Sequence, residues 1–375
     1  MISLIIKIKY SINKNTQELI IYFKFHNNKF YIKTILYMFL GMSPVRISFA
    51  GGGTDMPEYY ERFGGNVVST AITRFTYVII NPRNDNLVQA FSSDFQSHHE
   101  LTSYDKLVAK HGMELAVTVI KYLDYKDGAN FLISSDVPPG SGLGASSALA
   151  VNLVKTISSL KGQEMTREIL AETSYHIGRN VLKWPIGKQD EYISAFGGFN
   201  YIKFEKDKVN VIPIKMNKAS FLELQQNLLL FFIGDTRTSS TILSTQIKRI
   251  KKNQKDTMDS LNYVKHLAEI MYKSLKKSDI TAVAELLHKG WTAKKKFTKS
   301  VTSERIDRIY DMSLKYGAIG GKLTGAGGGG HMLLYCELPK QQKLIEKMER
   351  LGLKHVKFGF QNEGPRVLNL YDFVK

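Results

Sequence analysis

Residues 138–152 read PPGSGLGASSALAVN and follow a short apolar stretch, NFLIS, at residues 130–134. The pattern predicts a strand, then a loop with glycine at every second position, and then an alanine-rich helix over residues 145–159. A glycine-rich turn at the start of a helix brings several backbone N–H groups to the positive end of the helix dipole. Such a turn suits an anion, most often a phosphate. Taken alone, the pattern is equally consistent with a tight turn that binds nothing.

The spacing of this loop excludes two common phosphate-binding loops. The Walker loop requires a lysine after its last glycine, and the dinucleotide loop requires the spacing G-x-G-x-x-G. Gly140, Gly142 and Gly144 alternate instead, and no lysine follows them. The motif that remains is a proline, Pro138, followed after three residues by Gly-Leu-Gly-Ala-Ser-Ser-Ala.

Composition limits the functional classes. The chain has 375 residues and a single cysteine, Cys336, which excludes an internal disulfide and a cysteine-based metal cluster within one chain. This usage fits a reducing compartment, and we expect a cytoplasmic protein. A formal charge of +18 favours anionic partners: nucleic acid, a membrane surface or phosphorylated small molecules. A compositional bias of the source explains the lysine content equally well.

Two of these partner classes find little support in the sequence. No basic helix with interleaved aromatic residues and no zinc spacing indicates nucleic-acid binding. In the first 41 residues, no apolar run approaches the roughly 20 residues that cross a bilayer. We therefore expect no nucleic-acid partner and no membrane partner; the oligomeric state stays open.

The chain divides into three parts by its patterns. Residues 1–41 are rich in lysine and aromatic residues, and their alternating pattern is consistent with a hairpin around Asn27-Asn28. The alternative, which we favour, is that the native chain starts at Met42 and that residues 1–41 are a non-native or non-functional extension. Residues 42–220 predict an α+β domain, with a helix over 105–125, another over 166–182, and a strand pair near 199–216. Residues 221–375 predict a strand at 227–234, helices over 255–277, 279–299 and 303–316, and a closing helix with a final strand pair.

Three glycine-rich segments then have to be considered together. The middle segment, PPGSGLGASSA, resembles the motif P-x-x-x-G-L-G-S-S-A-A of the GHMP small-molecule kinases. VRISFAGGGTD at residues 45–55 lies where galactokinases carry their first motif, and KLTGAGGGG at residues 322–330 is similar to the third motif of the family. The resemblance implies a two-domain α+β fold, with an N-terminal domain like domain 2 of ribosomal protein S5 and a ferredoxin-like C-terminal domain.

Within this superfamily the chain resembles the bacterial D-glycero-D-manno-heptose 7-phosphate kinases. The shared stretches are SPVRISFAGGGTDMPEYY, PIGKQDEYISAFGGFNYIKF, GDTRTSS and GWTAKKKF. The resemblance implies transfer of the γ-phosphate of ATP to the anomeric hydroxyl of a sugar phosphate, giving the 1,7-bisphosphate for nucleotide-activated heptoses. A fucose or galactose 1-kinase, or an inactive member that binds nucleotide or sugar phosphate, are the alternatives.

The resemblance also assigns residues to ATP and Mg²⁺. Ser146 aligns with the serine whose hydroxyl contacts Mg²⁺. Backbone N–H groups in the loop and the dipole of the following helix would hold the phosphates. The expected nucleotide-binding residues are Pro139, Gly140, Ser141, Gly142, Leu143, Gly144, Ala145, Ser146 and Ser147.

For catalysis, the resemblance implies that Asp190 is the proton acceptor and that Arg46 lies beside it as a fixed cation. Asp55 aligns with a sugar-binding aspartate. A phosphorylated sugar also needs basic groups, for which Lys188, Arg237 and residues 294–296 are candidates, although the lysine run is also typical of a solvated helix end. The expected substrate-binding residues are Gly52, Gly53, Thr54, Asp55, Lys188, Arg237, Gly327 and Gly328.

One position departs from the family pattern. Relatives carry a glutamate twelve residues before the catalytic aspartate as a second Mg²⁺ ligand, and this chain has Gly178 there. A glycine inside a helix costs about 1 kcal/mol relative to alanine. Water, Glu191 or His176 would then have to serve the metal, or activity would be reduced.

Overall fold

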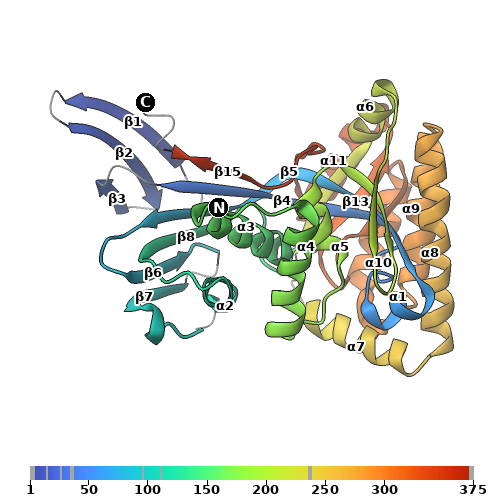
Figure 1. Cartoon of the computed structure of the whole chain (residues 1–375). Coiled ribbons are helices and arrows are strands. Elements are labelled where there is room, and N and C mark those ends of the chain that lie inside the picture. Colours follow the sequence, from blue (N-terminus) through green and yellow to red (C-terminus); the bar gives the residue numbers. More distant parts are fainter. Residues whose placement is uncertain are drawn as a thin grey trace.

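The computed structural model describes residues 5–13, 16–25, 28–33, 38–94, 97–109, 112–234 and 239–370. The chain forms an N-terminal domain around one mixed sheet and a C-terminal domain around a second, antiparallel sheet (Figure 1). The N-terminal sheet consists of β4 (Phe39–Ala50), β5 (Gly65–Pro82), β6 (Leu87–Ser92), β7 (Ser97–Ser103), β8 (Ala129–Ser135), β9 (Phe199–Phe204), β10 (Val209–Pro213) and β15 (Arg366–Asn369).

The longest strand, β5, organises the N-terminal sheet. It pairs antiparallel with β4 along its length, with β9 through residues 65–70 and with β8 through residues 76–82. Such a run of apolar and β-branched residues favours a strand that is buried on both faces. The helices of this domain are α1 (Pro57–Phe63), α2 (Glu114–Tyr122), α3 (Ala145–Leu160), α4 (Arg167–His176) and α5 (Gln189–Phe196), with a 3₁₀ turn at Tyr104–Lys106 and a π-helical turn at Ile177–Val181.

The C-terminal domain has the expected ferredoxin-like order. Its strands are β11 (Leu228–Gly234), β12 (Ala318–Leu323), β13 (Gly330–Cys336) and β14 (Lys354–His355), arranged as β12-β13-β11-β14. The helices are α6 (Lys218–Gln226), α7 (Ser239–Lys251), α8 (Lys255–Lys276), α9 (Ile280–Lys294), α10 (Glu304–Lys315) and α11 (Leu338–Arg350), with a 3₁₀ turn at Lys299–Val301. The two-domain α+β fold predicted from the sequence is confirmed.

Three apolar cores hold the molecule together. One lies between the N-terminal sheet and α2, α3 and α4, and another lies inside the C-terminal domain. The remaining core is shared, because it joins Ile47 and Phe49 of β4 to Leu267 and Met271 of α8 and to Leu333 of β13. Burial of such side chains is worth roughly 1.5–3 kcal/mol each. The two domains are therefore packed through a common apolar interior.

The residues before β4 form a separate sheet of β1 (Ile5–Asn13), β2 (Thr16–Phe25) and β3 (Asn28–Lys33), paired antiparallel. β2 and β3 match the hairpin considered from the sequence, with Phe25 opposite Asn28; its turn lies outside the described residues. The expected boundary before Met42 falls inside β4, where residues 39–42 pair with β15. Likewise, the expected domain boundary at residue 220 falls inside α6.

Two sequence predictions need correction. Within the residues predicted as a helix over 105–125, the described helix is α2, because Gly112 has a φ of +79° and the described residues 104–109 form a 3₁₀ turn and a loop. The final strand pair does not exist as a pair: β14 joins β11, whereas β15 returns to the N-terminal sheet beside β4. Alternation of apolar residues predicts a strand, but the partner depends on the fold.

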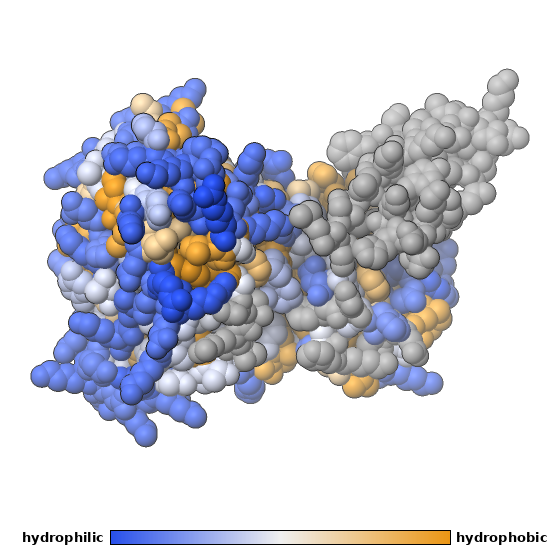
Figure 2. Space-filling model, turned by 180° about the vertical axis from the view of Figure 1, so that it is seen from behind, coloured by the Kyte–Doolittle hydropathy of each residue, from blue (hydrophilic) through white to orange (hydrophobic). Residues whose placement is uncertain are grey.

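Hydrophilic residues cover most of the face drawn in Figure 2, and hydrophobic residues on it form separate small groups. Among the described residues, no helix is both long enough and apolar enough to cross a membrane.

Candidate active site

A pocket of about 170 Å³ lies where the two domains meet. Its N-terminal wall contains the end of β4 with the following glycines, the loop before α3, and the start of α5. Its C-terminal wall contains residues of α7, α9 and β12 together with Gly325 and Ala326. All three glycine-rich segments of the sequence therefore contribute to one site.

The loop before α3 explains the alternating glycines. Gly140, Gly142 and Gly144 all have positive φ, at +71°, +78° and +73°. A Cβ atom on Gly142 would lie 2.7 Å from the Thr324 carbonyl oxygen, and one on Gly144 would lie 2.9 Å from Oδ2 of Asp190. Glycine is thus required both for the backbone conformation and for close approach.

This loop presents unused donors to the pocket. Gly144 is the N-cap of α3 and provides no side-chain cap, so the first N–H groups of the helix depend on another acceptor. The loop is also held from the C-terminal domain, because Nδ1 of His331 donates to the Ser141 carbonyl oxygen at 2.8 Å. A fixed helix N-terminus with free N–H groups is suited to phosphate.

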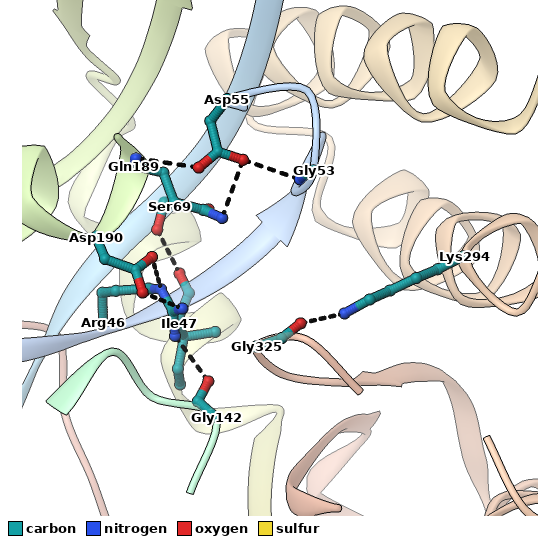
Figure 3. Close-up of polar contacts among 10 residues, drawn as sticks. All are labelled: Arg46, Ile47, Gly53, Asp55, Ser69, Gly142, Gln189, Asp190, Lys294 and Gly325. Carbon is teal, nitrogen blue, oxygen red and sulfur yellow. Dashed lines mark hydrogen bonds and ion pairs between the residues drawn. The ribbon is translucent and has the colours of Figure 1, made fainter. Parts of the chain in front are cut away.

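Arg46 and Asp190 form the central ion pair of the pocket. Nε and Nη2 of Arg46 donate to the two carboxylate oxygens of Asp190, each at 2.6 Å, and Nη1 donates to the Gly142 carbonyl oxygen at 2.7 Å. Figure 3 shows this guanidinium between the carboxylate and the glycine loop. A bidentate arginine fixes both the position and the plane of a carboxylate. The other lone pairs of its oxygens stay available to a substrate hydroxyl.

Asp55 connects the first glycine segment to the loop before α5. It is fully buried and accepts from the Gly53 N–H at 2.9 Å and from the Gln189 N–H at 3.2 Å. Burial, followed by the negative charge of Asp190, raises the pKa of Asp55 above its ordinary value. A Cβ on Gly187 would lie only 2.1 Å from Oδ2 of Asp55. Gly187 lies within the shared stretch PIGKQD but was not among the expected site residues; the structure shows that its lack of a Cβ makes room for Asp55.

A second acidic residue of α5, Glu191, interacts with the helix that follows the glycine loop. It is 1% exposed and interacts with the Ser147 side chain, while its Oε2 has no partner among the described residues. Burial and the charge of Asp190 raise the pKa of Glu191 to about 8. Glu191 thus contacts the first turn of α3 through Ser147.

Gly178 occupies the π-helical turn after α4. A Cβ there would lie 2.8 Å from Cδ1 of Ile186 and 3.4 Å from the Trp184 ring, so this position faces apolar side chains. Ile186 itself lines the pocket.

Two buried lysines line the pocket from the C-terminal domain. Nζ of Lys294 donates to the carbonyl oxygens of Gly325 and Leu323, and Nζ of Lys322 donates to the Phe49 carbonyl oxygen at 3.3 Å. Figure 3 shows Lys294 entering from the side opposite Arg46 and Asp190. Of the predicted lysine run, only Lys294 reaches the pocket, since Lys295 pairs with Asp307 and Lys296 is exposed elsewhere.

Several predicted residues lie apart from the pocket lining. Nζ of Lys188 binds both carboxylate oxygens of Glu172, at 2.7 and 2.9 Å. The hydroxyl of Thr54 donates to the Gly51 carbonyl oxygen within the turn. Pro139 and Leu143 belong to the loop but do not line the cavity.

The last predicted glycines also serve packing. Gly327 and Gly328 pack against Val301, whose carbonyl oxygen accepts from the Gly328 N–H at 2.8 Å. Their neighbour Gly325 makes the close approach instead, because a Cβ there would lie 2.5 Å from the Gly142 Cα. Arg237 lies outside the described residues.

Two protein family models match the parts of the chain that form this site. The family model "GHMP kinases N terminal domain" matches residues 112–198, and "GHMP kinases C terminal" matches residues 271–355. The first match contains the loop before α3 and Asp190, whereas the second contains α9 and β12.

Individual relatives cover nearly the whole chain. D-glycero-alpha-D-manno-heptose 7-phosphate kinase of Campylobacter jejuni is 30% identical over 328 residues, covering 86% of this chain and 96% of the relative. The bifunctional fucokinase/GDP-fucose pyrophosphorylase of Arabidopsis thaliana is 26% identical, covering 82% of this chain and 30% of that protein. The crystal structure of a D-glycero-D-manno-heptose 1-phosphate kinase from Bacteroides thetaiotaomicron superposes with a TM-score of 0.74, at 25% identity and 89% and 99% coverage.

Proposed function

This chain belongs to the GHMP kinase family and is a phosphotransferase with an alcohol acceptor, and we propose that this acceptor is the anomeric hydroxyl of D-glycero-D-manno-heptose 7-phosphate. The product would be the 1,7-bisphosphate, an intermediate for nucleotide-activated heptoses. The observation that carries the proposal is the bidentate Arg46–Asp190 pair, which lies directly against the glycine loop in the interdomain pocket.

The glycine loop and α3 form the ATP side of the site. The unused N–H groups at the start of α3, together with the helix dipole, hold the β- and γ-phosphates. Gly142 and Gly144 keep the loop free of side chains, so that phosphate oxygens approach the backbone closely.

Asp190 and Arg46 act on the acceptor. The Asp190 carboxylate accepts the proton of the attacking hydroxyl, the hydroxyl oxygen bonds to the γ-phosphorus, and ADP leaves with the electrons of the broken bond. Arg46 holds the carboxylate in place and contributes positive charge next to the transferred group. Asp55, which lies on the same N-terminal wall as Asp190, accepts hydrogen bonds from sugar hydroxyls when it is ionised.

The residues around Ser146 fit a Mg²⁺ ion that arrives with the nucleotide. No group of three or more His, Cys, Asp or Glu side chains among the described residues could hold a metal on its own. Ser146 is exposed at the first turn of α3, and Glu191, whose Oε2 has no partner among the described residues, interacts with the neighbouring Ser147. Mg²⁺ commonly keeps waters and takes phosphate oxygens as ligands, and it neutralises charge on the transferring group.

The heptose phosphate is preferred over other sugars because two heptose phosphate kinases match nearly their full lengths. A fucose-type 1-kinase is the second candidate, supported by the fucokinase relatives at 26% identity. The inactive alternative has less support, since the Arg46–Asp190 pair is intact and position 178 faces Ile186 rather than an open metal position.

A turnover assay tests the proposal. The full chain is incubated with ATP and Mg²⁺ and, in parallel, with D-glycero-D-manno-heptose 7-phosphate, its dephosphorylated sugar, L-fucose, D-galactose and D-mannose 6-phosphate. We expect fastest ADP release with the heptose 7-phosphate, and a new anomeric phosphate in the ³¹P NMR spectrum of the product. Faster turnover of fucose or galactose would contradict the heptose 7-phosphate as the acceptor and assign that sugar in its place. ATP binding without any turnover would favour the inactive alternative.

A further inference from the structure

The two pocket lysines are buried, and among the described residues neither is in an ion pair with a carboxylate. Lys294 is 8% exposed and Lys322 is 5% exposed. Their hydrogen-bond acceptors are backbone carbonyl oxygens, and neither forms an ion pair within the described part of the chain. Lysine is almost never buried unless it is paired, because an ammonium ion loses hydration. A buried pair of cations that faces a pocket therefore calls for an anion from outside the protein.

Other donors near the lysines are also unpartnered. Oγ of Ser48 and Nε2 of Gln246 are buried, line the same pocket, and find no partner among the described residues. Both lie at the first glycine segment: a Cβ on Gly52 would be 3.2 Å from Oγ of Ser48, and one on Gly53 would be 2.7 Å from Nε2 of Gln246. Lys322 is bound next to Ser48, at the carbonyl of Phe49. Donors that converge without acceptors indicate a ligand with several oxygens.

We propose that Lys294 and Lys322, with the amide of Gln246, form a binding site for the phosphate group that the acceptor already carries. This inference rests on the proposed function, because it explains how the same site recognises a phosphorylated acceptor. The α3 N-terminus already provides donors for the nucleotide phosphates on the other wall. Lys322 lies against the first glycine segment, where it also lines a small recess with Phe49 and Gly52.

The arrangement allows an acceptor to span the pocket. The reacting hydroxyl lies at Asp190 on the N-terminal wall, whereas the phosphate lies against α9 and β12 on the C-terminal wall. A phosphate dianion has enough acceptor oxygens for two ammonium groups and an amide. An unphosphorylated sugar of the same stereochemistry would leave these cations buried and unpaired, so the site discriminates between the two.

Electrostatics predicts proton uptake when such an anion binds. Burial, then the charge of Arg46, lowers the pKa of Lys294 to about 7, while Asp55 and Asp190 oppose this effect. Burial, Lys294 and Arg46 lower the pKa of Lys322 well below its ordinary value. At pH 8 Lys294 is therefore largely neutral in the empty pocket. A bound dianion raises both pKa values, so the complex gains protons.

Calorimetric titration without ATP tests the site on the full chain. The ligands are D-glycero-D-manno-heptose 7-phosphate, D-mannose 6-phosphate, their two dephosphorylated sugars and inorganic phosphate. The variants are Lys322→Met and Lys294→Met, which keep side-chain length without charge. Lys289→Met is the matched control, since Lys289 lies on α9 but is exposed and paired with Glu285.

For each lysine variant we expect about 10- to 100-fold weaker binding of the phosphorylated sugars. Binding of the dephosphorylated sugars and of ATP should change by less than about threefold, and Lys289→Met should match the parent. Titrations at pH 8 in two buffers of different ionisation enthalpy should show proton uptake by the parent that is smaller in each variant.

The outcomes separate this inference from the proposed function. Weaker binding of mannose 6-phosphate or inorganic phosphate in both variants would support the site even if the heptose phosphate is not turned over. If both variants still turn over the heptose phosphate and bind it with unchanged affinity, the proposed phosphate site is wrong, whereas the proposed kinase function stands. Loss of ATP affinity in place of sugar phosphate affinity would assign the lysines to the nucleotide and overturn the inference. Thermal unfolding identifies a variant that fails to fold, in which case the other lysine variant decides.

Discussion

The two walls of the pocket differ in how their charges are compensated. On the N-terminal wall, Arg46 and Asp190 neutralise each other, and Asp55 is held by backbone N–H groups. On the C-terminal wall, Lys294 and Lys322 have only carbonyl oxygens as partners. The comparison teaches that the proposed catalytic groups are preorganised by the protein, whereas the proposed phosphate site on the C-terminal wall would be completed by a ligand. The predictions below test each wall separately.

The largest effect is expected on the N-terminal wall. Asp190→Asn keeps the shape of the side chain but removes the proton acceptor, so kcat should fall by about 10²- to 10⁴-fold. ATP affinity should stay within a few-fold, because the proposed nucleotide site is the glycine loop and not Asp190. Steady-state kinetics with a parallel ATP titration measures both. A variant with unchanged kcat would remove Asp190 from its catalytic role.

Next comes the glycine loop itself. Gly144→Val should weaken ATP binding by at least about 10²-fold, because a β-branched residue resists the φ of +73° and its Cβ would lie against Asp190. Gly162→Val is the matched control: Gly162 has a similar φ of +67°, but a Cβ there meets nothing within 4 Å. Equal ATP affinity in both folded variants, measured by calorimetry, would mean that the loop is only a turn.

On the C-terminal wall, Lys294→Met should stabilise the protein that has no ligand. At pH 7 we expect a gain in the free energy of unfolding on the order of 1–4 kcal/mol, since a buried unpaired cation is removed. The pKa of Lys294 is about 7 in the folded protein and near 10.5 when unfolded, so the unfolded chain holds more protons between these values. The parent therefore loses stability as pH falls from about 10.5 to about 7.

The stability gain of Lys294→Met over the parent should accordingly grow as the pH falls from about 10.5 to about 7, and it should level off below pH 7. Urea unfolding at pH 7, 8 and 9 measures this dependence. Lys289→Met should change stability by less than about 0.5 kcal/mol at each pH, as is typical of exposed charges. A constant difference between Lys294→Met and the parent would indicate that Lys294 already has a compensating partner.

The smallest effect on activity is expected from a truncation. Removing residues 1–37 should leave kcat within about twofold, because every described residue that lines the pocket lies after them. Removing residues 1–41 should also lower the free energy of unfolding by about 1–2 kcal/mol, which corresponds to a few degrees in melting temperature. The reason is that residues 39–41 pair with β15 and that the Gly41 carbonyl oxygen accepts from the Asn152 side chain. Equal melting temperatures of the two truncations would show that this end of β4 contributes little.

Sequence patterns could predict those features that are local. The glycine loop and the helices α3 and α8 were predicted from local sequence, and the motifs shared with the kinase family indicated Arg46, Asp55 and Asp190 as candidates. The site brings these three together, although their roles remain predictions. Features that depend on distant segments were missed. Gly187 matters only because Asp55 packs against it, and Lys322 matters because β12 places its ammonium at Phe49, 273 residues earlier.

The return of β15 explains a similar failure. A four-residue strand carries little sequence signal, and its pairing with β4 is decided by where the chain crosses back between the domains. Before β15, where the chain returns to the N-terminal domain, the Phe360 N–H donates to Oε1 of Gln225 at 2.7 Å. Gln225 belongs to α6, the helix at which the chain first enters the C-terminal domain. Neither contact is visible from the periodicity of either segment.

The apolar core shared by β4, α8 and β13 has a consequence for how the molecule comes apart. Because Ile47 and Phe49 are buried against Leu267 and Met271, separating the two domains would expose the same side chains that unfolding exposes. The strand β15 also connects the two domains, because it follows the C-terminal domain in the sequence but pairs with β4 of the N-terminal sheet. Calorimetry should therefore record a single heat absorption peak, and neither half should be obtainable as a folded fragment.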